Sequence, residues 1–183
     1  MSTLSHRLTM LVALQLALAA AVHAPATSAP ELPAEIRAQL SAAYPGWRFA
    51  RLLPALRHEL QSDDPRRRST EWIAGDFDGN HRRDYAVQIV RPGPADSVQL
   101  VVAFLAGDRG QYRASVVTAG GEHLGTILTT AGRGQRVMDY AKSGTADSVF
   151  VLAHDAVVLL INEGGGITCL YERDRWRCVV SAD

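Results

Sequence analysis

The sequence lacks an excess of charge of either sign, and it lacks the short motifs by which many enzymes are recognised. Its 19 basic and 19 acidic residues balance, so the composition gives no reason to expect nucleic acid or an acidic membrane surface as the main partner. It contains no G-x-S-x-G, no H-E-x-x-H and no glycine-rich loop that would cradle a phosphate. These absences argue against nucleic-acid binding and against the common motif-defined enzyme classes.

Neighbouring histidine and acidic residues, a frequent start of an acid–base site, are also scarce. The three such pairs are His58-Glu59, Glu122-His123 and His154-Asp155. Each pair is adjacent in the chain, so on a strand its two side chains point to opposite faces. No residue is therefore predicted to be catalytic, and the chain is predicted not to be an enzyme. The alternative is a carbohydrate-active or other hydrolase whose carboxylates come from distant segments, because such pairs are recognised only by geometry.

The long apolar run at the N-terminus, from Leu8 to Val22, is shorter than the ~20 residues that a membrane-spanning helix needs. It follows a charged start and precedes small residues, which predicts a secretory signal peptide at residues 1–26. A membrane anchor is the alternative. Removal of the signal takes away Arg7 and leaves 18 basic against 19 acidic residues, a net charge of −1. Residues 27–183 suit a single domain, expected in the periplasm or outside the cell with no stable membrane insertion.

Cysteine is nearly absent, and the two that occur, Cys169 and Cys178, lie close together in the chain. An exported compartment permits a disulfide. If a hairpin turns at Arg173 and Asp174, the two cysteines stand opposite each other at a non-hydrogen-bonded position. There the Cα atoms approach to about 4.5 Å, which a disulfide accepts. The spacing predicts a Cys169–Cys178 bridge, and two buried free thiols are the alternative.

The pattern of apolar residues changes once along the chain. Leu32, Ile36, Leu40 and Ala43 fall at helical spacing before a Tyr-Pro-Gly stop, which predicts one short N-terminal helix. From Glu71 onward the runs are short and separated by turn residues. The predicted strands are Thr70–Ala74, Tyr85–Val90, Val98–Ala106, Tyr112–Thr118, Arg136–Tyr140, Ser148–Ala153, Ala156–Asn162, Ile167–Tyr171 and Trp176–Ser181.

Strands at this spacing without helices between them indicate an antiparallel β domain. We expect a mainly β fold, either β-propeller-like or β-sandwich-like. Residues 119–135, rich in Gly and Thr, carry no pattern that assigns them. No internal repeat is present, so an array of copied blades is not supported.

The stretch GDFDGNHRRDYAVQIV, residues 75–90, has oxygen-bearing side chains at metal-ligand spacing. Counted from Asp76, side-chain oxygens stand at positions 1, 3, 5 and 9, which are Asp76, Asp78, Asn80 and Asp84; Arg82 at position 7 would offer its backbone carbonyl. Hard oxygen ligands at these positions favour Ca²⁺. Position 12 is a valine rather than the glutamate of an EF-hand. A metal-free Asp/Gly turn is the alternative, and a bound ion is expected to be structural.

The same stretch resembles the FG-GAP/VCBS-type motif, in which a calcium loop links two strands of a propeller-like blade. The resemblance implies Ca²⁺ ligands at Asp76, Asp78, Asn80 and Asp84, with the Arg82 carbonyl, in a small exported bacterial protein. It covers about 16 residues. The sequence departs from this motif in two ways that affect metal binding. His81 replaces the usual glycine at a position that requires a positive φ. Arg82 and Arg83 add positive charge beside the carboxylates, which should weaken cation binding.

A weaker resemblance extends to periplasmic lysozyme inhibitors and immunity proteins. It rests on YAKSGTADS, which is similar to the loops that such inhibitors insert into an active-site cleft, and it implies partner contacts at Lys142, Ser143 and Thr145. An ordinary turn is the alternative. The expected function is an exported, non-enzymatic, calcium-stabilised protein-binding module, with a cell-wall hydrolase as the expected class of partner.

Overall fold

The computed structural model describes residues 31–51, 71–92, 97–120, 126–142, 148–161 and 165–181. The chain divides into two compact units, Met1–Glu31 and Leu32–Asp183, and the elements below belong to the second. The predicted signal peptide, residues 1–26, lies outside the described residues. Within the described ranges, no helix is both long and apolar enough to cross a membrane.

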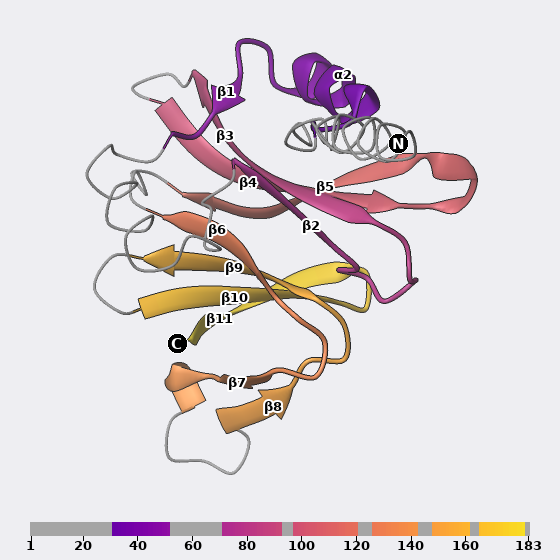
Figure 1. The fold of residues 1–183 in the computed structure, drawn as a ribbon. Coiled ribbons are helices and arrows are strands. Elements are labelled where there is room, and N and C mark those ends of the chain that lie inside the picture. The colour runs from indigo at the N-terminus through magenta and orange to yellow at the C-terminus, as the bar shows by residue number, and fades with distance from the viewer. Residues whose placement is uncertain are drawn as a thin grey trace, which may run out of the picture. The chain divides into compact units, whose positions relative to one another are not determined.

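The described elements are one α-helix, two short 3-10 helices and eleven strands (Figure 1). The strands pair antiparallel throughout. In chain order they are α2 (Ala34–Ala43), β1 (Arg48–Phe49), β2 (Trp72–Gly75), β3 (Asp84–Pro92), β4 (Ser97–Ala106), η1 (Asp108–Gly110), β5 (Tyr112–Gly120), β6 (Ile127–Ala131), β7 (Arg136–Met138), η2 (Tyr140–Lys142), β8 (Val149–Val151), β9 (Ala156–Ile161), β10 (Gly165–Glu172) and β11 (Arg175–Ser181). The prediction of a mainly β, antiparallel fold with one short N-terminal helix is confirmed.

The strands form three sheets. The first sheet has the order β1-β3-β4-β5, and β2 also pairs with β3; the second has the order β11-β10-β9-β6; the third contains β7 and β8. β1 pairs with residues 89–90 of β3 and β2 with residues 84–87, so the two short strands follow each other along one edge. We call residues 132–142 and 148–155, which include the third sheet, the β7–β8 unit.

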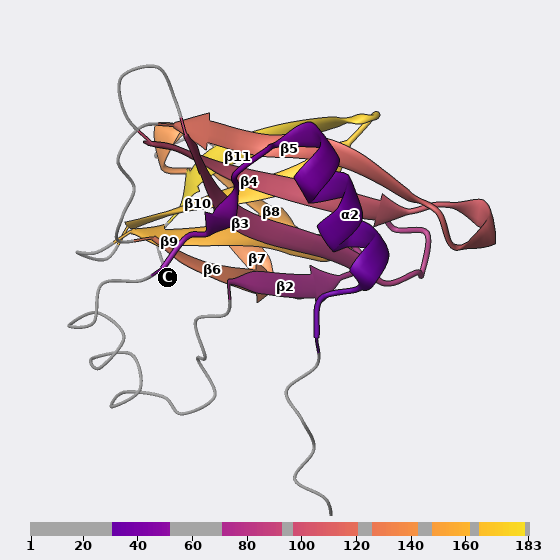
Figure 2. The ribbon, with the colours of Figure 1, turned by 90° about the horizontal axis from the view of Figure 1, so that it is seen from above.

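The core lies in three layers that explain the burial pattern of the strands. Between the first and second sheets, Phe77, Ala103 and Leu105 pack in one cluster with Val157 and Leu159. On the other face of the first sheet, Val87 and Ile89 pack against the buried side of α2 (Figure 2). A third cluster joins the second sheet to the β7–β8 unit.

Strand β3 is therefore covered on both faces, and residues 84–90 are all buried. This burial accounts for its nearly continuous apolar sequence. On the helix side, Ile36 and Leu40 are fully buried, and each stabilises the contact by about 1.5–3 kcal/mol.

Each of the nine predicted strands has a counterpart, and no predicted bound differs from the observed one by more than two residues. Two strands were missed. β1 has only two residues, too few for any alternation to be visible. β6 lies in the unassigned Gly- and Thr-rich segment, and its pattern is broken because only Leu128 and Ala131 are buried. In this segment, pairing with β9 rather than local sequence determines the strand.

Candidate functional site

The predicted metal loop connects β2 to β3, and Gly75 and Asp84 form the last pair of the hairpin before it. Asp76, Asp78 and Asp84 each offer one carboxylate oxygen, and these three atoms all lie within 4.8 Å of one another. Asp84 is buried, and the other two are half-buried. Three of the five predicted ligands are therefore brought together in a group that could hold a metal ion.

Asp84 is the innermost member of this group. Its Oδ2 accepts a hydrogen bond from the Phe77 amide at 2.8 Å, and its Oδ1 accepts one from the Ala106 amide at 2.7 Å. Burial raises the pKa of this carboxyl from 3.8 to about 6, although the two amides act in the opposite direction. The negative charge of Asp78 raises it further. Asp84 thus anchors the loop to the end of β4.

Asp78 and Asn80 hold the outer part of the loop. Asp78 accepts hydrogen bonds from the Asn80 backbone amide and side-chain amide, at 3.1 and 3.0 Å. The Asn80 Nδ2 also donates to the Ala106 carbonyl at 2.7 Å, and its Oδ1 accepts from the Arg82 amide at 2.8 Å. These contacts fix the orientation of the Asn80 amide. Each oxygen retains a second lone pair that a cation could use.

Asp76 carries the observation that best fits a cation. Its Oδ1 is buried and has no hydrogen-bond partner among the described residues, whereas its Oδ2 lies 3.4 Å from Nδ1 of the exposed His81. A buried acceptor left unpaired costs about 1–3 kcal/mol, and more when it is charged. A cation beside Asp76, Asp78 and Asp84 would satisfy this oxygen.

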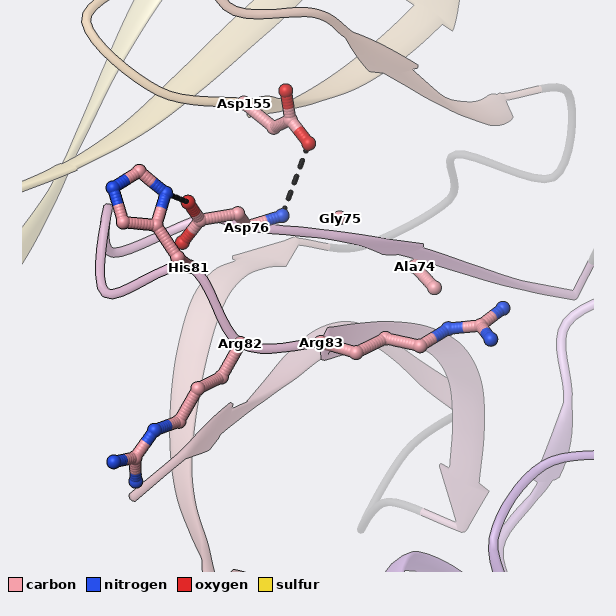
Figure 3. A pocket seen from close by; sticks show the side chains of 7 residues that line it. All are labelled: Ala74, Gly75, Asp76, His81, Arg82, Arg83 and Asp155. Atoms are coloured by element: carbon pink, nitrogen blue, oxygen red, sulfur yellow. Dashed lines mark hydrogen bonds and ion pairs between the residues drawn. The ribbon is translucent and has the colours of Figure 1, made fainter. Parts of the chain in front are cut away.

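The arginine side chains of the loop do not point at Asp76. Figure 3 shows the Arg82 and Arg83 side chains directed away from Asp76. The Arg82 guanidinium pairs with Asp108 at 2.7 Å, and that of Arg83 lies 5.6 Å from the centre of the Tyr85 ring. Because Arg82 is paired with Asp108 and Arg83 lies beside the Tyr85 ring, these two charges should weaken cation binding less than their positions in the sequence suggest.

Backbone geometry explains the glycines of the motif. Gly79 has φ +78°, and a Cβ added at Gly75 would lie 2.7 Å from the Phe77 ring and 2.9 Å from Oδ2 of Asp155. His81 has φ 63°, so it adopts the positive φ that the sequence pattern requires at that position. The conformation costs a non-glycine residue about 1–2 kcal/mol.

The residue that sequence analysis missed is Asp155, which follows β8 in the chain and lines the same surface pocket as Asp76 and His81 (Figure 3). The Asp76 amide donates to Asp155 Oδ2 at 3.0 Å, and the Asp155 amide donates to the Asp76 carbonyl at 3.0 Å. The sequence offered only the adjacency of His154 and Asp155, which gave no sign of a partner 79 residues away.

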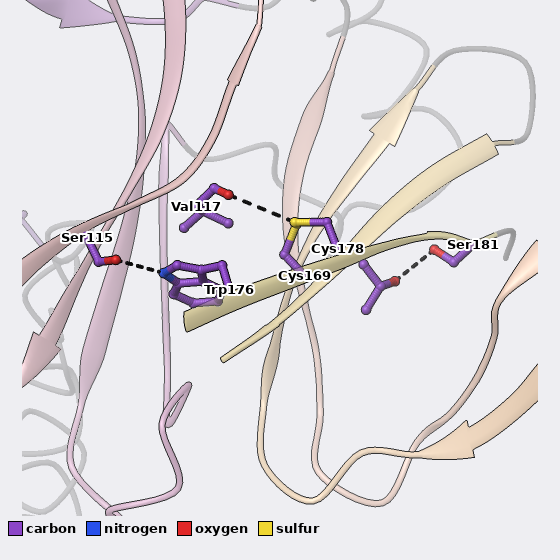
Figure 4. Close-up of a disulfide and its surroundings, with 7 residues drawn as sticks. Ser115, Val117, Cys169, Trp176, Cys178 and Ser181 are labelled. Atoms are coloured by element: carbon purple, nitrogen blue, oxygen red, sulfur yellow. Dashed lines mark hydrogen bonds between the residues drawn. A yellow bond between two sulfur atoms is a disulfide. The ribbon is translucent and has the colours of Figure 1, made fainter. Parts of the chain in front are cut away.

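The disulfide lies apart from this loop. Cys169 and Cys178 are bonded, face each other across β10 and β11, and have Cα atoms 4.0 Å apart. The hairpin turns at Arg173 and Asp174, both with positive φ, in the register expected from the sequence. Figure 4 shows Trp176 donating to Ser115 and the Cys178 sulfur near the Val117 carbonyl, which connects this hairpin to β5.

Of the three predicted partner contacts, Lys142 lies in η2, and Ser143 and Thr145 lie outside the described residues. The neighbouring sheet presents apolar side chains to solvent. The pairing of β7 with β8 places Arg136, Met138, Val149 and Val151 on one side, which we call the β7–β8 face. Met138 is 40% exposed and Val151 62% exposed.

The exposed charged residues of the β7–β8 unit, as far as the structure describes it, are basic. In the described parts of the β7–β8 unit, Arg133, Arg136 and Lys142 are exposed, whereas Asp139 is only 5% exposed. Tyr140, which follows β7, is 47% exposed. The unit therefore offers apolar side chains beside positive charge.

Comparison with known proteins gives no relative from which a role could be transferred. The chain matches no family model, no curated protein and no solved structure.

Proposed function

We propose that residues 76–84 bind Ca²⁺ as a structural clip, held by Asp76, Asp78, Asn80, Asp84 and the Arg82 carbonyl. The observation that carries this proposal is the buried, unpartnered Oδ1 of Asp76 within a group of three carboxylates. Hard oxygen donors of this kind suit Ca²⁺ better than zinc or copper. Bound there, the ion would supply positive charge beside the buried Asp84 and the half-buried Asp76 and Asp78.

A structural role fits the surroundings of the loop. Phe77 is fully buried in the core between the two larger sheets, Asp84 holds the Ala106 amide at the end of β4, and Asp76 is bonded to Asp155 beyond β8. An ion at this point would stabilise the contact between segments that are distant in sequence. The shared core between the two sheets favours the sandwich-like arrangement over the propeller-like one.

The metal assignment is tested by adding calcium to chelator-treated protein. The melting temperature is expected to rise with calcium concentration, because a ligand that binds only the folded state stabilises it, by about 2.7 kcal/mol at 100 times Kd. Asp78→Ala should abolish the rise. Asp174→Ala removes an exposed carboxylate from the β10–β11 turn and should leave the rise unchanged. No shift at millimolar calcium would overturn the assignment.

For the whole protein, we propose an exported, non-enzymatic module that binds another protein through the β7–β8 face and Lys142. The exposed apolar side chains support this role, because apolar surface flanked by charge is typical of contact sites. The basic flank fits a partner surface that carries carboxylates. The cleft of a lysozyme-like cell-wall hydrolase has this character, because glycoside hydrolases use a pair of carboxylates. The disulfide supports an oxidising compartment, such as the periplasm or the cell exterior.

The binding role is tested by measuring inhibition of a panel of purified muramidases by the full chain, with peptidoglycan hydrolysis by the chain measured in parallel. Inhibition without turnover is expected. Met138→Glu and Val151→Glu should weaken inhibition at least tenfold. Val180→Glu, at a 55% exposed position on β11, serves as the matched control. Turnover of peptidoglycan by the chain itself would instead favour the hydrolase alternative.

A further inference from the structure

We propose that Asp155 is a positioning residue of the candidate metal site, which holds Asp76 from outside the loop and connects the site to the β7–β8 unit. The inference rests on the proposed calcium function. It concerns a residue that does not belong to the loop and is separated from Asp76 by most of the described chain.

Asp155 holds the backbone of Asp76 rather than its carboxylate. The two residues exchange a pair of hydrogen bonds, from the Asp76 amide to Asp155 Oδ2 and from the Asp155 amide to the Asp76 carbonyl, each 3.0 Å long. The second carboxylate oxygen, Oδ1, accepts from the Arg133 amide at 3.0 Å. Since both oxygens already accept backbone amides, Asp155 is better suited to fixing Asp76 than to ligating the ion itself.

The fit between the two segments is close. A Cβ at Gly75 would lie 2.9 Å from Asp155 Oδ2 and 3.2 Å from its Cβ, so only glycine allows the chain to approach Asp155 at this point. Gly79 lies next to His154, where an added Cβ would be in ordinary van der Waals contact, 3.4 Å from the His154 ring. The turn at residues 154–155 therefore fits against the loop at two places. Asp155 therefore holds the backbone of Asp76 at both its amide and its carbonyl, and Figure 3 shows the first of these bonds.

Asp155 also connects the loop to the β7–β8 unit. Its bond to the Arg133 amide reaches the turn that precedes β7. The same turn is held to the end of β8 by two backbone bonds, Gly134 amide to Leu152 carbonyl and Leu152 amide to Gln135 carbonyl, each 2.9 Å. An ion that restrains Asp76 would therefore also restrain the base of the β7–β8 unit, and the coupling must be reciprocal.

The inference is tested by calorimetric titration of the metal-stripped protein with CaCl₂, at a temperature where every variant is folded. Asp155→Ala is expected to weaken calcium binding about 10–100-fold, the usual effect of removing a group that orients a metal ligand. Asp155→Asn keeps one acceptor oxygen and should fall between Asp155→Ala and the wild type. Asp174→Ala should bind as the wild type does.

Hydrogen exchange provides the second readout. Calcium should slow exchange of the Arg133 amide in the wild type and leave it unchanged in Asp155→Ala. A purely structural role for Asp155 would lower the melting temperature of the metal-free variant and leave its calcium affinity intact. If Asp155→Ala does not fold, Asp155→Asn gives the affinity comparison.

The outcomes separate the two proposals. Wild-type affinity in Asp155→Ala, or in Asp155→Asn should the alanine variant not fold, overturns the positioning role and leaves the calcium site standing. Absence of calcium binding by the wild-type chain overturns both proposals. Weakened binding in the variant together with loss of the calcium effect on Arg133 exchange supports the positioning role.

Discussion

At the scale of single residues, Asp84 has two roles that oppose each other in the metal-free protein. Its carboxylate organises the loop by accepting hydrogen bonds from the Phe77 and Ala106 amides, and an ionised carboxylate accepts such bonds best. Its complete burial, however, disfavours the ionised form and raises the pKa to about 6. A bound cation would remove this opposition.

The raised pKa of Asp84 predicts how the stability of the metal-free protein depends on pH. A carboxyl whose pKa is higher in the folded state binds its proton more tightly there. Its stabilising contribution is therefore fully present below pH 3.8 and is lost as the pH rises through about 6. The change is on the order of 3 kcal/mol, at 1.36 kcal/mol per pKa unit.

Urea denaturation of metal-stripped wild type and Asp84→Asn between pH 4.5 and 7.5 measures this effect. The asparagine does not titrate, so the wild type should lose free energy of unfolding relative to the variant as the pH rises. A wild-type-to-Asp84→Asn difference that stays constant across this range would contradict the predicted titration.

At the scale of elements, the β10–β11 hairpin shows which features can be predicted from local sequence. Two turn residues and two cysteines at equal distances from the turn were enough to predict the register, because pairing in a hairpin follows from the position and length of its loop. The ligand spacing of the 76–84 loop is equally local, and three of its carboxylates do converge. Strand β6 lacked such local signals, since it is specified by pairing with β9.

The disulfide should make a measurable contribution to stability. It closes a short loop, with a sequence separation of 9 residues. In the chain-entropy description, closing a loop of this length stabilises the fold by roughly 2–3 kcal/mol. Replacing both cysteines by alanine should therefore lower the free energy of unfolding by about that amount in urea titrations.

Reduction provides the control for this measurement. A thiol reductant should move the unfolding midpoint of the wild type toward that of the double variant, and should leave the double variant unchanged. Equal midpoints for oxidised wild type and double variant would show that the bridge does not constrain the unfolded chain.

At the scale of the whole molecule, the contacts between sheets are those that the sequence did not reveal. Asp155 accepts a hydrogen bond from the Asp76 amide, 79 residues away in the sequence. Thr126 accepts one from the Gln88 side chain, 38 residues away. Periodicity and turn chemistry describe one element at a time, so they predict which residues are buried but not which residues face them. The three converging carboxylates could be predicted because they lie in one loop, whereas Asp155, which is hydrogen-bonded to the loop from outside, could not.

The polar contact around Thr126 gives a prediction at this scale. Gln88 on β3 and Gln99 on β4 belong to the first sheet, and both donate to the Thr126 hydroxyl, at 2.7 and 3.2 Å, next to β6 of the second sheet. All three residues are buried. Thr126→Val keeps the shape of the side chain but removes the acceptor, which leaves two buried amide donors without this partner. Each such loss costs about 1–3 kcal/mol, so for the two donors we expect the variant to be less stable by about 2–6 kcal/mol.

Urea denaturation of three variants separates the hydroxyl from the rest of the side chain. Thr126→Ser keeps the acceptor and should retain most of the wild-type stability. Thr130→Val makes the same chemical change at a half-buried position on β6 and should be nearly neutral, because valine suits a strand at least as well as threonine. If Thr126→Val is as stable as Thr130→Val, the hydroxyl does not link the sheets. If only Thr126→Val is destabilised, the two sheets are joined by a buried polar contact as well as by their apolar core.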